Sequence, residues 1–391
     1  MRVAIINSVN KIRSTGRISF ELGEYLKANG LESCVFYGRY NNSEGRYFGS
    51  KIDFFFHSVF SRVFGRHASY SKMRTNKLIK DLKAYQPDVF VVNNLHGYYI
   101  NFKKIMSYIA STGKKTIFIF HDSWNLTVHC SYFSYIKCNE WQNGCRKCLH
   151  KRLYPISWFS DNTKLNFRIK EECFSKISNK IIVCPSSWLA ELVRDSYLKS
   201  SSIKTIHNGI DIDRFSKRDN QFRTKYNLQN KRIILSIAYF FGEKKGIFDI
   251  IKLSKLIDEN TVIITVGILA KNISLPNNVI NIQKTDNFDD LIDIYSSADV
   301  FLNTTYEDNY PTVNLEALSC SLPVVSYMTG GSCELIDPRF AVPVGDVDAA
   351  YNLISQILDK KIDYVFPNKK ELSNVECFKS YLRLIIGDEN E

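Results

Sequence analysis

The sequence predicts an α/β protein with two doubly wound domains, each a parallel sheet covered by helices. Short runs of β-branched and apolar residues alternate with helical patterns along the chain, and this alternation is typical of parallel sheets. The length of 391 residues suffices for two or three domains of ordinary size. The hydrophobic share of 45% is normal for a globular protein. No stretch reaches the roughly 18 consecutive apolar residues of a membrane-spanning helix.

The first domain is predicted from five strands. The apolar run after Met1 is too short for a signal peptide and polar residues follow it, so it predicts a first strand and a cytosolic chain. In doubly wound domains the ligand binds at the carboxyl ends of the strands. The predicted strands are Val3–Asn7, Cys34–Tyr37, Val89–Asn93, Thr116–Phe120 and Ile181–Cys184.

The second domain follows a polar segment, Ser216–Asn230, which reads as a linker that runs into a short helix. We therefore expect domains at residues 1–215 and 216–372. Residues 373–391 include an amphipathic helix with the character to return to the first domain. The predicted strands are Arg232–Ile237, Thr261–Val266, Val300–Asn303 and Pro323–Ser326.

The net charge of +12 restricts the class of partner. A surplus of this size indicates an anionic ligand, an anionic membrane surface or nucleic acid. No nucleic-acid recognition motif accompanies the charge, so the first two are favoured. Ten cysteines at this length do not indicate a disulfide scaffold, and a reducing compartment would keep most of them as thiols.

Residues 306–336 carry the strongest functional pattern. The acidic pair Glu307-Asp308 follows an apolar strand, and Glu316 lies eight residues after Asp308, in the first turn of a predicted helix. A buried strand and then Gly330-Gly331 follow. Carboxylates can hold ribose hydroxyls, while unpaired amides and the dipole at a helix start favour a diphosphate. The pattern predicts a sugar-nucleotide site; the alternative is an ordinary strand, turn and helix with solvated acids.

This order resembles the E-x7-E and GG-x-x-E signatures of the retaining glycosyltransferases of family 4, from Asp308 to Glu316 and ending at Glu334. The resemblance covers nearly the whole chain. It implies the GT-B architecture, two Rossmann-like domains facing a central cleft, and a nucleotide diphosphate sugar donor of the UDP or GDP type. It also implies catalysis without a required cofactor, with Asp308 on the sugar hydroxyls and Glu316 on the ribose. The implied donor-binding residues here are Asp308, Asn309, Tyr310, Thr312, Glu316, Gly330 and Gly331.

A basic turn, FFGEKKG at residues 240–246, resembles the dyad with which the family clamps the donor diphosphate. Phe240 stands where the family usually has arginine. Lys244 and Lys245 are adjacent cations that can both reach a diphosphate, and Lys245 is a candidate catalytic residue. Solvated lysines are the alternative. Pro311 replaces the family's usual glycine and has no N–H, so we expect Thr312 to supply an amide and a hydroxyl.

The segment Asn208-Gly209-Ile210-Asp211 resembles the family's motif at the domain junction. Asn-Gly is a turn dipeptide because both residues tolerate positive φ, so we interpret the motif as structural. The Asp211-x-Asp213 spacing is common by chance and does not indicate a metal site.

The first domain resembles a bacterial subgroup of the family that acts in colanic acid, O-antigen and exopolysaccharide assembly. Ser14-Thr15-Gly16 follows the first strand and is flexible enough to bring amides to a phosphate or sugar. His121 ends a predicted strand, where a neutral imidazole can hydrogen-bond a donor sugar hydroxyl, so it is a candidate catalytic residue. Gly16 is a candidate donor contact, and the acceptor-side candidates are Ser14, Thr15, His96 and Asp122.

Four cysteines lie close together in the first domain, at Cys130, Cys138, Cys145 and Cys148. Only the last pair has the C-x-x-C spacing of a zinc knuckle. A structural zinc, disulfides formed on oxidation, and plain thiols all remain open readings of this cluster.

Residues 51–83 combine basic and aromatic side chains, including Phe54-Phe55-Phe56, Arg66 and Lys72. This combination suits an anionic membrane leaflet. The alternative is one amphipathic helix with phenylalanines in the core and solvated lysines.

We therefore expect a retaining, metal-independent glycosyltransferase that moves a sugar to a saccharide, itself lipid-linked, in the synthesis of bacterial surface polysaccharide. It would work in the cytoplasm, peripherally at the inner face of the membrane. Two alternatives belong to other classes. One is a non-catalytic sugar-nucleotide or saccharide binder of the same fold, and the other is a zinc-containing nucleic-acid-binding protein, whose affinity would fall steeply with salt.

Overall fold

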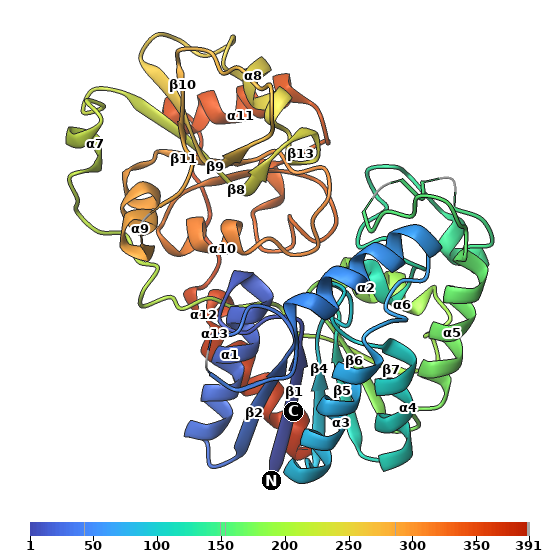
Figure 1. The fold of residues 1–391 in the computed structure, drawn as a ribbon. Coiled ribbons are helices and arrows are strands. Elements are labelled where there is room, and N and C mark those ends of the chain that lie inside the picture. The colour runs from blue at the N-terminus through green and yellow to red at the C-terminus, as the bar shows by residue number, and fades with distance from the viewer. Residues whose placement is uncertain (43, 149, 153, 286, 389–391) are drawn as a thin grey trace. The chain divides into compact units, whose positions relative to one another are not determined.

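The computed structural model describes residues 1–42, 44–148, 150–152, 154–285 and 287–388. The chain divides into two compact units: unit 1 contains Met1–His207 and Phe378–Glu391, and unit 2 contains Asn208–Cys377. Each unit is built around one parallel sheet (Figure 1). The α/β fold that the sequence predicts is confirmed.

Unit 1 has a seven-stranded sheet in the order β3-β2-β1-β4-β5-β6-β7, with every pair parallel. All five predicted strands are present. The two additional strands, β3 and β7, lie at the sheet edges. The strands are β1 (Arg2–Asn7), β2 (Glu32–Tyr37), β3 (Arg46–Tyr47), β4 (Val89–Val92), β5 (Lys115–Ile119), β6 (Lys180–Cys184) and β7 (Ser202–Thr205).

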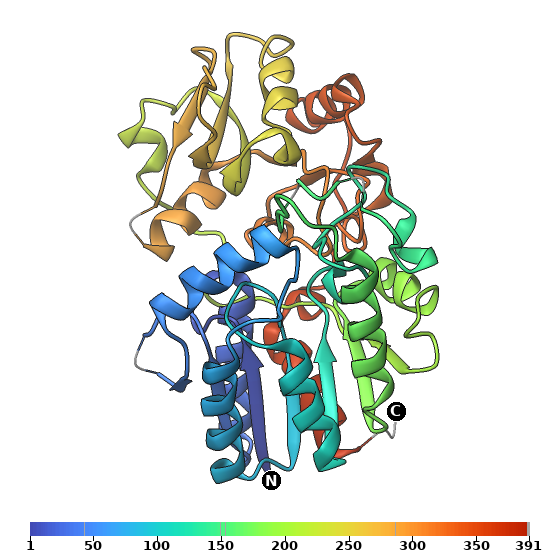
Figure 2. The same ribbon diagram turned by 45° about the vertical axis from the view of Figure 1, so that its right-hand side comes forward.

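Helices lie on both sides of this sheet (Figure 2). Alternate residues of β1 pack on its opposite faces. Ile6 shares a buried cluster with Leu78 and Ile105, which lie on α3 and α4. Ile5 points to the other face, where Gly23 allows α1 to approach: a Cβ there would lie 3.5 Å from Ile5 Cδ1. The helices are α1 (Arg13–Ala28), α2 (Lys51–Phe64), α3 (Lys72–Tyr85), α4 (Phe102–Thr112), α5 (Thr163–Ser175), α6 (Ser187–Arg194) and α13 (Asn374–Ile386).

Unit 2 has a six-stranded parallel sheet in the order β10-β9-β8-β11-β12-β13. The strands are β8 (Arg232–Phe241), β9 (Thr261–Leu269), β10 (Val279–Ile282), β11 (Val300–Asn303), β12 (Val324–Tyr327) and β13 (Ala341–Val342). The helices are α7 (Phe222–Lys225), α8 (Ile247–Leu253), α9 (Phe288–Ser297), α10 (Thr312–Ser319), α11 (Val347–Leu358) and α12 (Lys369–Leu372).

Helices cover both faces of this second sheet. Phe301 of β11 clusters with α9 and α10, through Ile292 and Leu315. Leu302, the next residue, clusters with α8 and α11, through Ile250 and Ile354. Both units are therefore doubly wound, and the strand order reverses between β1 and β4 and between β8 and β11. Ligands of such folds bind at the carboxyl ends of the strands beside these points.

Three local expectations from the sequence are wrong. Ser14–Gly16 is not a loop, because α1 begins at Arg13 and includes it. Residues 51–83 form two helices, α2 and α3, so the aromatic residues of α2 and the lysines of α3 do not share one helix. Gly209 does not have the positive φ that was the reason given for its place in an Asn-Gly turn. Glycine is needed there for close approach instead, because a Cβ would lie 2.3 Å from the Ser373 carbonyl oxygen.

Among the described helices, none has both the length and the apolar content to cross a membrane.

Candidate functional site

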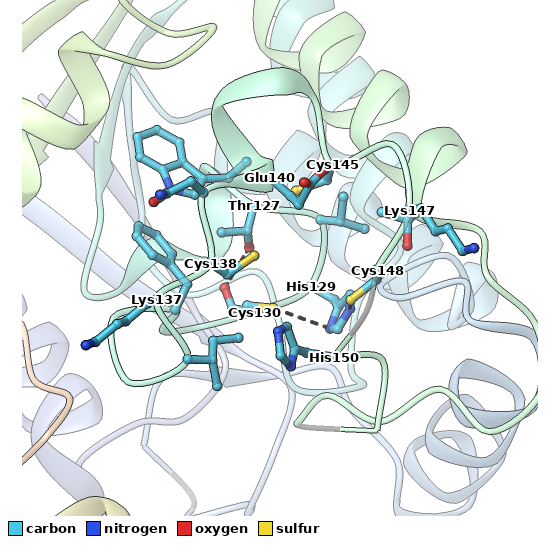
Figure 3. A pocket seen from close by; sticks show the side chains of 16 residues that line it. Thr127, His129, Cys130, Lys137, Cys138, Glu140, Cys145, Lys147, Cys148 and His150 are labelled. Atoms are coloured by element: carbon cyan, nitrogen blue, oxygen red, sulfur yellow. Dashed lines mark hydrogen bonds between the residues drawn. The ribbon is translucent and has the colours of Figure 1, made fainter.

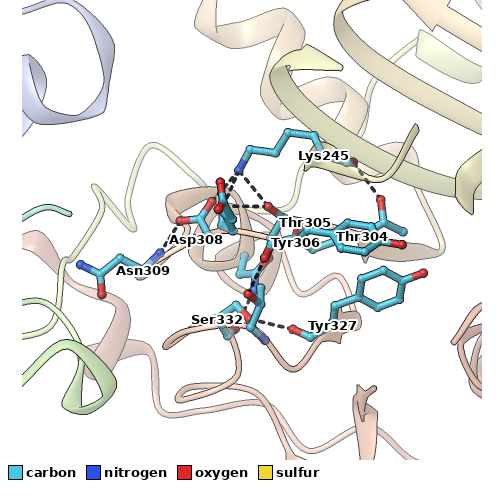
Figure 4. Close-up of polar contacts among 12 residues, drawn as sticks. Lys245, Thr304, Thr305, Tyr306, Asp308, Asn309, Tyr327 and Ser332 are labelled. Atoms are coloured by element: carbon cyan, nitrogen blue, oxygen red, sulfur yellow. Dashed lines mark hydrogen bonds and ion pairs between the residues drawn. The ribbon is translucent and has the colours of Figure 1, made fainter. Parts of the chain in front are cut away.

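The acid loop of unit 2, residues 304–308, follows the carboxyl end of β11. It contacts the lysine turn, residues 242–246, which follows β8 (Figure 4). The side chain of Lys245 donates to Asp308 Oδ2 at 2.7 Å and to Thr305 Oγ1 at 3.0 Å. The Lys245 carbonyl accepts from Thr304 Oγ1 at 3.1 Å. These contacts place a cation beside the carboxylate that the sequence assigns to the sugar.

Lys244 makes a second ion pair between the same two segments. Its Nζ lies 2.7 Å from Oε2 of Glu307, a carboxylate with 4% of its side chain exposed. The Lys244 carbonyl accepts from the Tyr306 amide at 2.9 Å. Sequence reasoning assigned Glu307 no role of its own; its position beside Asp308 is the signal that was available.

Asp249 of α8 is a further site residue that sequence reasoning missed. It is 3% exposed and accepts hydrogen bonds from the hydroxyls of Tyr306, at 2.6 Å, and Tyr327, at 3.0 Å. It therefore ties the helix after the lysine turn to the acid loop and to the end of β12 (Figure 4 labels the two tyrosines). The signal for this residue in the sequence was a single acid within the apolar stretch IFDIIKL.

Glu316 lies in the second turn of α10, not the first, because that helix begins at Thr312. It is 5% exposed, and its Oε2 accepts from the hydroxyl of Tyr295 at 3.0 Å. The hydroxyl of Tyr295, on α9, thus holds the carboxylate of Glu316 in place.

The segment between these acids is tied to the glycine turn after β12. Asn309 is 2% exposed, and its carbonyl accepts from the amide of Gly331 at 2.9 Å. Its own amide donates to Asp308 Oδ1 at 2.9 Å. Gly330 has φ of 54°, a left-handed conformation that favours glycine. Tyr310 is buried, and Thr312 is the first residue of α10.

In unit 1, His121 follows β5 and its Nε2 lies 2.8 Å from Oδ1 of Asn93, which follows β4. Burial lowers the pKa of His121 to about 4, so the imidazole is neutral at pH 7. The buried Nδ2 of Asn93 has no hydrogen-bond partner within the described ranges. A polar ligand at this sheet edge would satisfy that donor.

Asp122 and His96 form a pair beside His121. His96 Nε2 lies 2.9 Å from Asp122 Oδ2, and Asp122 Oδ1 accepts from the Trp124 amide at 2.9 Å. Burial opposes ionisation of Asp122, but the charge of His96 and these hydrogen bonds hold its pKa below the usual value. The structure therefore brings together the three candidates that the sequence placed after β4 and β5.

The remaining candidates of unit 1 lie in the first turns of α1. The Thr15 carbonyl accepts from Asn7 Nδ2 at 3.1 Å, which anchors the helix to the end of β1. A Cβ on Gly16 would lie 3.0 Å from Val9 Cγ2, and the Gly16 carbonyl accepts from the Lys11 amide at 3.1 Å. Gly16 thus packs closely against the loop after β1, and a larger residue there would crowd Val9.

The four clustered cysteines line one cavity of about 200 Å³ in unit 1 (Figure 3). His129 lies between two of them, with Nε2 3.2 Å from Cys148 Sγ and Nδ1 3.9 Å from Cys130 Sγ. Burial raises the pKa of Cys130 and Cys145 to about 12, so both are neutral thiols at pH 7. Among the residues that the structure describes, no three His, Cys, Asp or Glu side chains are grouped so that they could hold a metal ion.

Each unit therefore gathers its candidate residues at the carboxyl edge of its own sheet. Unit 2 offers two lysines, four carboxylates and the start of a helix, a set that suits a diphosphate joined to a ribose and a sugar. Unit 1 offers neutral and ionised hydrogen-bonding groups that suit hydroxyls.

Comparison with protein families gives two matches that together cover most of the chain. The model described as Glycosyltransferase Family 4 matches residues 15–214, and the model described as Glycosyl transferases group 1 matches residues 218–372.

Two curated relatives align with part of the chain. N-acetyl-alpha-D-glucosaminyl L-malate synthase of Bacillus anthracis is 25% identical over 46% of this chain and 51% of its own length. UDP-Gal:alpha-D-GlcNAc-diphosphoundecaprenol alpha-1,3-galactosyltransferase of Escherichia coli is 21% identical over 51% of this chain and 57% of its own length. The chain thus spans little more than half the length of these relatives.

Among solved structures, Anabaena HepE in complex with UDP aligns with a TM-score of 0.62, over 98% of this chain and 95% of its own. At 13% identity this likeness concerns the fold. It agrees with two doubly wound units in one chain.

Proposed function

The chain belongs to glycosyltransferase family 4, and from that premise we propose that it transfers a sugar from a nucleotide diphosphate sugar with retention of the anomeric configuration. One observation carries the proposal most directly: Lys245 pairs at 2.7 Å with Asp308 at the carboxyl edge of unit 2. A donor needs a cation for its diphosphate next to an acceptor group for its sugar hydroxyls, and this pair supplies both.

In the proposed mechanism, the donor diphosphate competes with Asp308 and Glu307 for the two lysines. Lys245 and Lys244 then neutralise the charge that develops on the leaving diphosphate, assisted by the Thr312 amide at the start of α10. Asp308, released from Lys245, accepts from sugar hydroxyls, and Glu316 accepts from the ribose. The two lysines thus supply positive charge without a required metal.

Retention follows if the departing phosphate itself receives the proton of the acceptor hydroxyl, on the face of the sugar that it leaves. The chain then contributes position and charge rather than a general base. The neutral His121, held by Asn93, is proposed to hydrogen-bond a donor sugar hydroxyl, and the Asp122–His96 pair and Thr15 to lie on the acceptor side. Each is proposed from its place at the carboxyl edge of unit 1.

We further propose that the acceptor is a lipid-linked saccharide in the synthesis of a bacterial surface polysaccharide, used at the cytoplasmic face of the membrane. The printed name of the Escherichia coli relative, with its UDP-sugar and diphosphoundecaprenol, supports this class of donor and acceptor. A UDP-sugar is accordingly the first donor to test, with GDP-sugars next.

A thermal-shift panel of UDP-, GDP- and dTDP-sugars tests the donor proposal. A ligand at about 100 times its Kd adds roughly 2.7 kcal/mol of stability, so one nucleotide class should raise Tm clearly. Lys245→Met should abolish that rise, while Lys255→Met, at an exposed lysine just after α8, should keep it. No rise with any donor, or an equal rise in both variants, contradicts the proposed clamp.

A non-catalytic binder of the same fold would give the same thermal shifts. Release of the nucleoside diphosphate in the presence of saccharide acceptors separates the two functions, because only transfer or hydrolysis liberates it.

A further inference from the structure

Helix α2 of unit 1 has its side chains arranged opposite to those of an ordinary surface helix. It buries His57, Ser58 and Ser61, which are 1%, 6% and 0% exposed. His57 Nδ1 lies 2.6 Å from Ser71 Oγ, and burial lowers the pKa of His57 to about 3, so the buried side is neutral. The helix therefore turns small polar groups inward, while four of its phenylalanines and Ile52 are exposed.

The outer side of α2 is a ridge of phenylalanine rings. Consecutive rings contact one another, with centroids 5.6 Å apart for Phe55 and Phe56, 5.9 Å for Phe56 and Phe60, and 6.2 Å for Phe60 and Phe64. They are between 40% and 60% exposed, and Ile52 at the start of the ridge is 71% exposed. Apolar groups gathered in this way on one face mark an interaction surface rather than scattered exposure.

A second apolar segment lies against the same helix. The Trp158 amide donates to the Arg62 carbonyl at 2.6 Å, and Phe159 beside it is 74% exposed. Lys151 donates to the Phe159 carbonyl at 3.3 Å, so a cation accompanies this aromatic pair. We call Ile52, Phe55, Phe56, Phe60, Phe64, Trp158 and Phe159 the aromatic ridge.

A basic hollow begins where the ridge ends. Arg66, two residues after Phe64, lines a surface cavity of about 480 Å³ together with Lys72, Lys103 and Lys104. Its other lining residues are Ser69, Asn101, Ser107 and Ile169, none of them acidic. Four cations with serine and asparagine around one hollow suit a phosphate-bearing headgroup.

We propose that the aromatic ridge and the basic hollow form one docking surface for an anionic lipid bilayer. Aromatic side chains favour the boundary between headgroups and acyl chains, and the adjacent cations favour anionic headgroups. The charge decides between occupants: a second copy of this chain, itself strongly basic at +12, would present the same cations to the hollow. The docking is then partly apolar, so a part of it persists when salt screens the charges.

This surface deepens the proposed function, because it would bring unit 1 to a lipid-linked acceptor. Vesicle binding requires neither donor nor turnover, so it is measured apart from the sugar transfer. A protein that binds lipid without transferring sugar, or transfers sugar without binding lipid, would identify which proposal fails.

Flotation of the full chain with vesicles tests the surface. We expect strong association with vesicles containing phosphatidylglycerol, weaker association with pure phosphatidylcholine, and a residual association with the anionic vesicles at 0.5 M salt. The double variant Phe55→Ser with Phe56→Ser should lower the partition coefficient by about tenfold or more, since each ring leaves the interface. The matched control Phe248→Ser removes a ring that is 52% exposed in unit 2 and should change nothing.

A charge variant separates the two parts of the surface. The double variant Arg66→Gln with Lys72→Gln should remove the preference for anionic over neutral vesicles. The weaker association that comes from the aromatic ridge should remain. Circular dichroism and donor thermal shifts establish that each variant is folded. No association of the wild type with anionic vesicles at low salt, or equal losses in the control, overturns the proposal. So does a dimer in light scattering that the phenylalanine variant disrupts.

Discussion

At the scale of single residues, the donor proposal depends on Lys245 and Asp308. The sequence identifies both by the motifs around them, because a lysine before a glycine turn and an acid after a strand are local patterns. Their contact at 2.7 Å joins residues 63 positions apart, and no local pattern predicts it. The same holds for the pair of Lys244 and Glu307, whose importance becomes visible only when β8 and β11 lie side by side.

Asp308→Asn should separate nucleotide binding from turnover. The variant removes the carboxylate that competes for Lys245, so free UDP or GDP should bind as tightly as before or more tightly. Turnover should fall by about 10- to 150-fold, since a charge-assisted hydrogen bond to the sugar is worth about 1.5–3 kcal/mol. Titration calorimetry and initial rates measure the two effects. A large loss of affinity for the free nucleotide would show that Asp308 holds the diphosphate site together instead.

Glu316 and Tyr295 form a second test at this scale. Glu316→Gln should weaken nucleotide affinity by about tenfold or more, because a charged acceptor for the ribose is lost. Tyr295→Phe removes the 3.0 Å hydrogen bond to Glu316 and should cost about 1 kcal/mol of stability while nucleotide affinity changes little. Unchanged affinity in a folded Glu316→Gln protein would exclude the ribose role.

At the scale of elements, the strands with a continuous apolar run are the ones that the sequence predicts. All nine predicted strands are present, because each is buried and rich in β-branched residues. The missed strands are short or lie at a sheet edge: β3 and β13 have two residues each, β7 is a mostly exposed edge strand, SIKT, and β10 is a four-residue edge strand, VINI, that is mostly half-buried. For helix α2 the sequence left two interpretations open, a membrane-facing surface and phenylalanines in the core, and the exposed rings of Phe55, Phe56, Phe60 and Phe64 exclude the second.

The prediction at the scale of elements concerns Asp249, because this residue joins α8, the acid loop and β12. Both tyrosine hydroxyls donate to Oδ2 of Asp249, so Asp249→Asn can keep that acceptor oxygen but removes its negative charge, and the acid loop should be held less firmly. We expect the donor KM to rise by about tenfold, corresponding to one hydrogen bond of roughly 1.5 kcal/mol to a charged group. Tyr306→Phe should reproduce much of the effect.

The matched control for Asp249 is Lys252→Gln. Lys252 is the residue's exposed partner at 3.3 Å, and losing it should leave the kinetics unchanged. A variant Asp249→Asn that is less stable but has the wild-type KM would show a structural role without influence on the donor site.

At the scale of the whole molecule, chain length and the alternation of strand and helix patterns predict two α/β domains, and the net charge predicts a basic surface. The structure places the change of unit between His207 and Asn208. The boundary between the two units also falls within helix α13, whose residues from Phe378 onward belong to unit 1. There the ring centroids of Phe378 and Tyr25 lie 5.8 Å apart. The amphipathic pattern of that helix predicts that it packs somewhere, but the partner depends on the tertiary fold.

Acid should destabilise unit 1 because it contains buried neutral histidines. Burial lowers the pKa of His57 to about 3 and that of His129 to about 4, below the ordinary 6.5 of the unfolded chain. The unfolded state therefore binds more protons below pH 6.5. The unfolding free energy should fall by up to about 1.4 kcal/mol per pH unit for each histidine as pH drops from 6.5 toward 4.

Urea unfolding at pH 7, 6 and 5 measures this slope. His57→Gln should reduce this slope, because that buried histidine no longer takes up a proton on unfolding. An identical slope in the His57 variant would mean that another group controls the acid response.

The central claim is that this chain transfers a sugar with retention, using lysines in place of a metal. The most direct measurement is a reaction of the purified protein with an active donor and acceptor in excess EDTA, followed by NMR assignment of the anomeric configuration of the product. The account predicts undiminished transfer and a product with the configuration of the donor. An inverted product, or transfer that stops in EDTA and returns with magnesium or manganese, would contradict it.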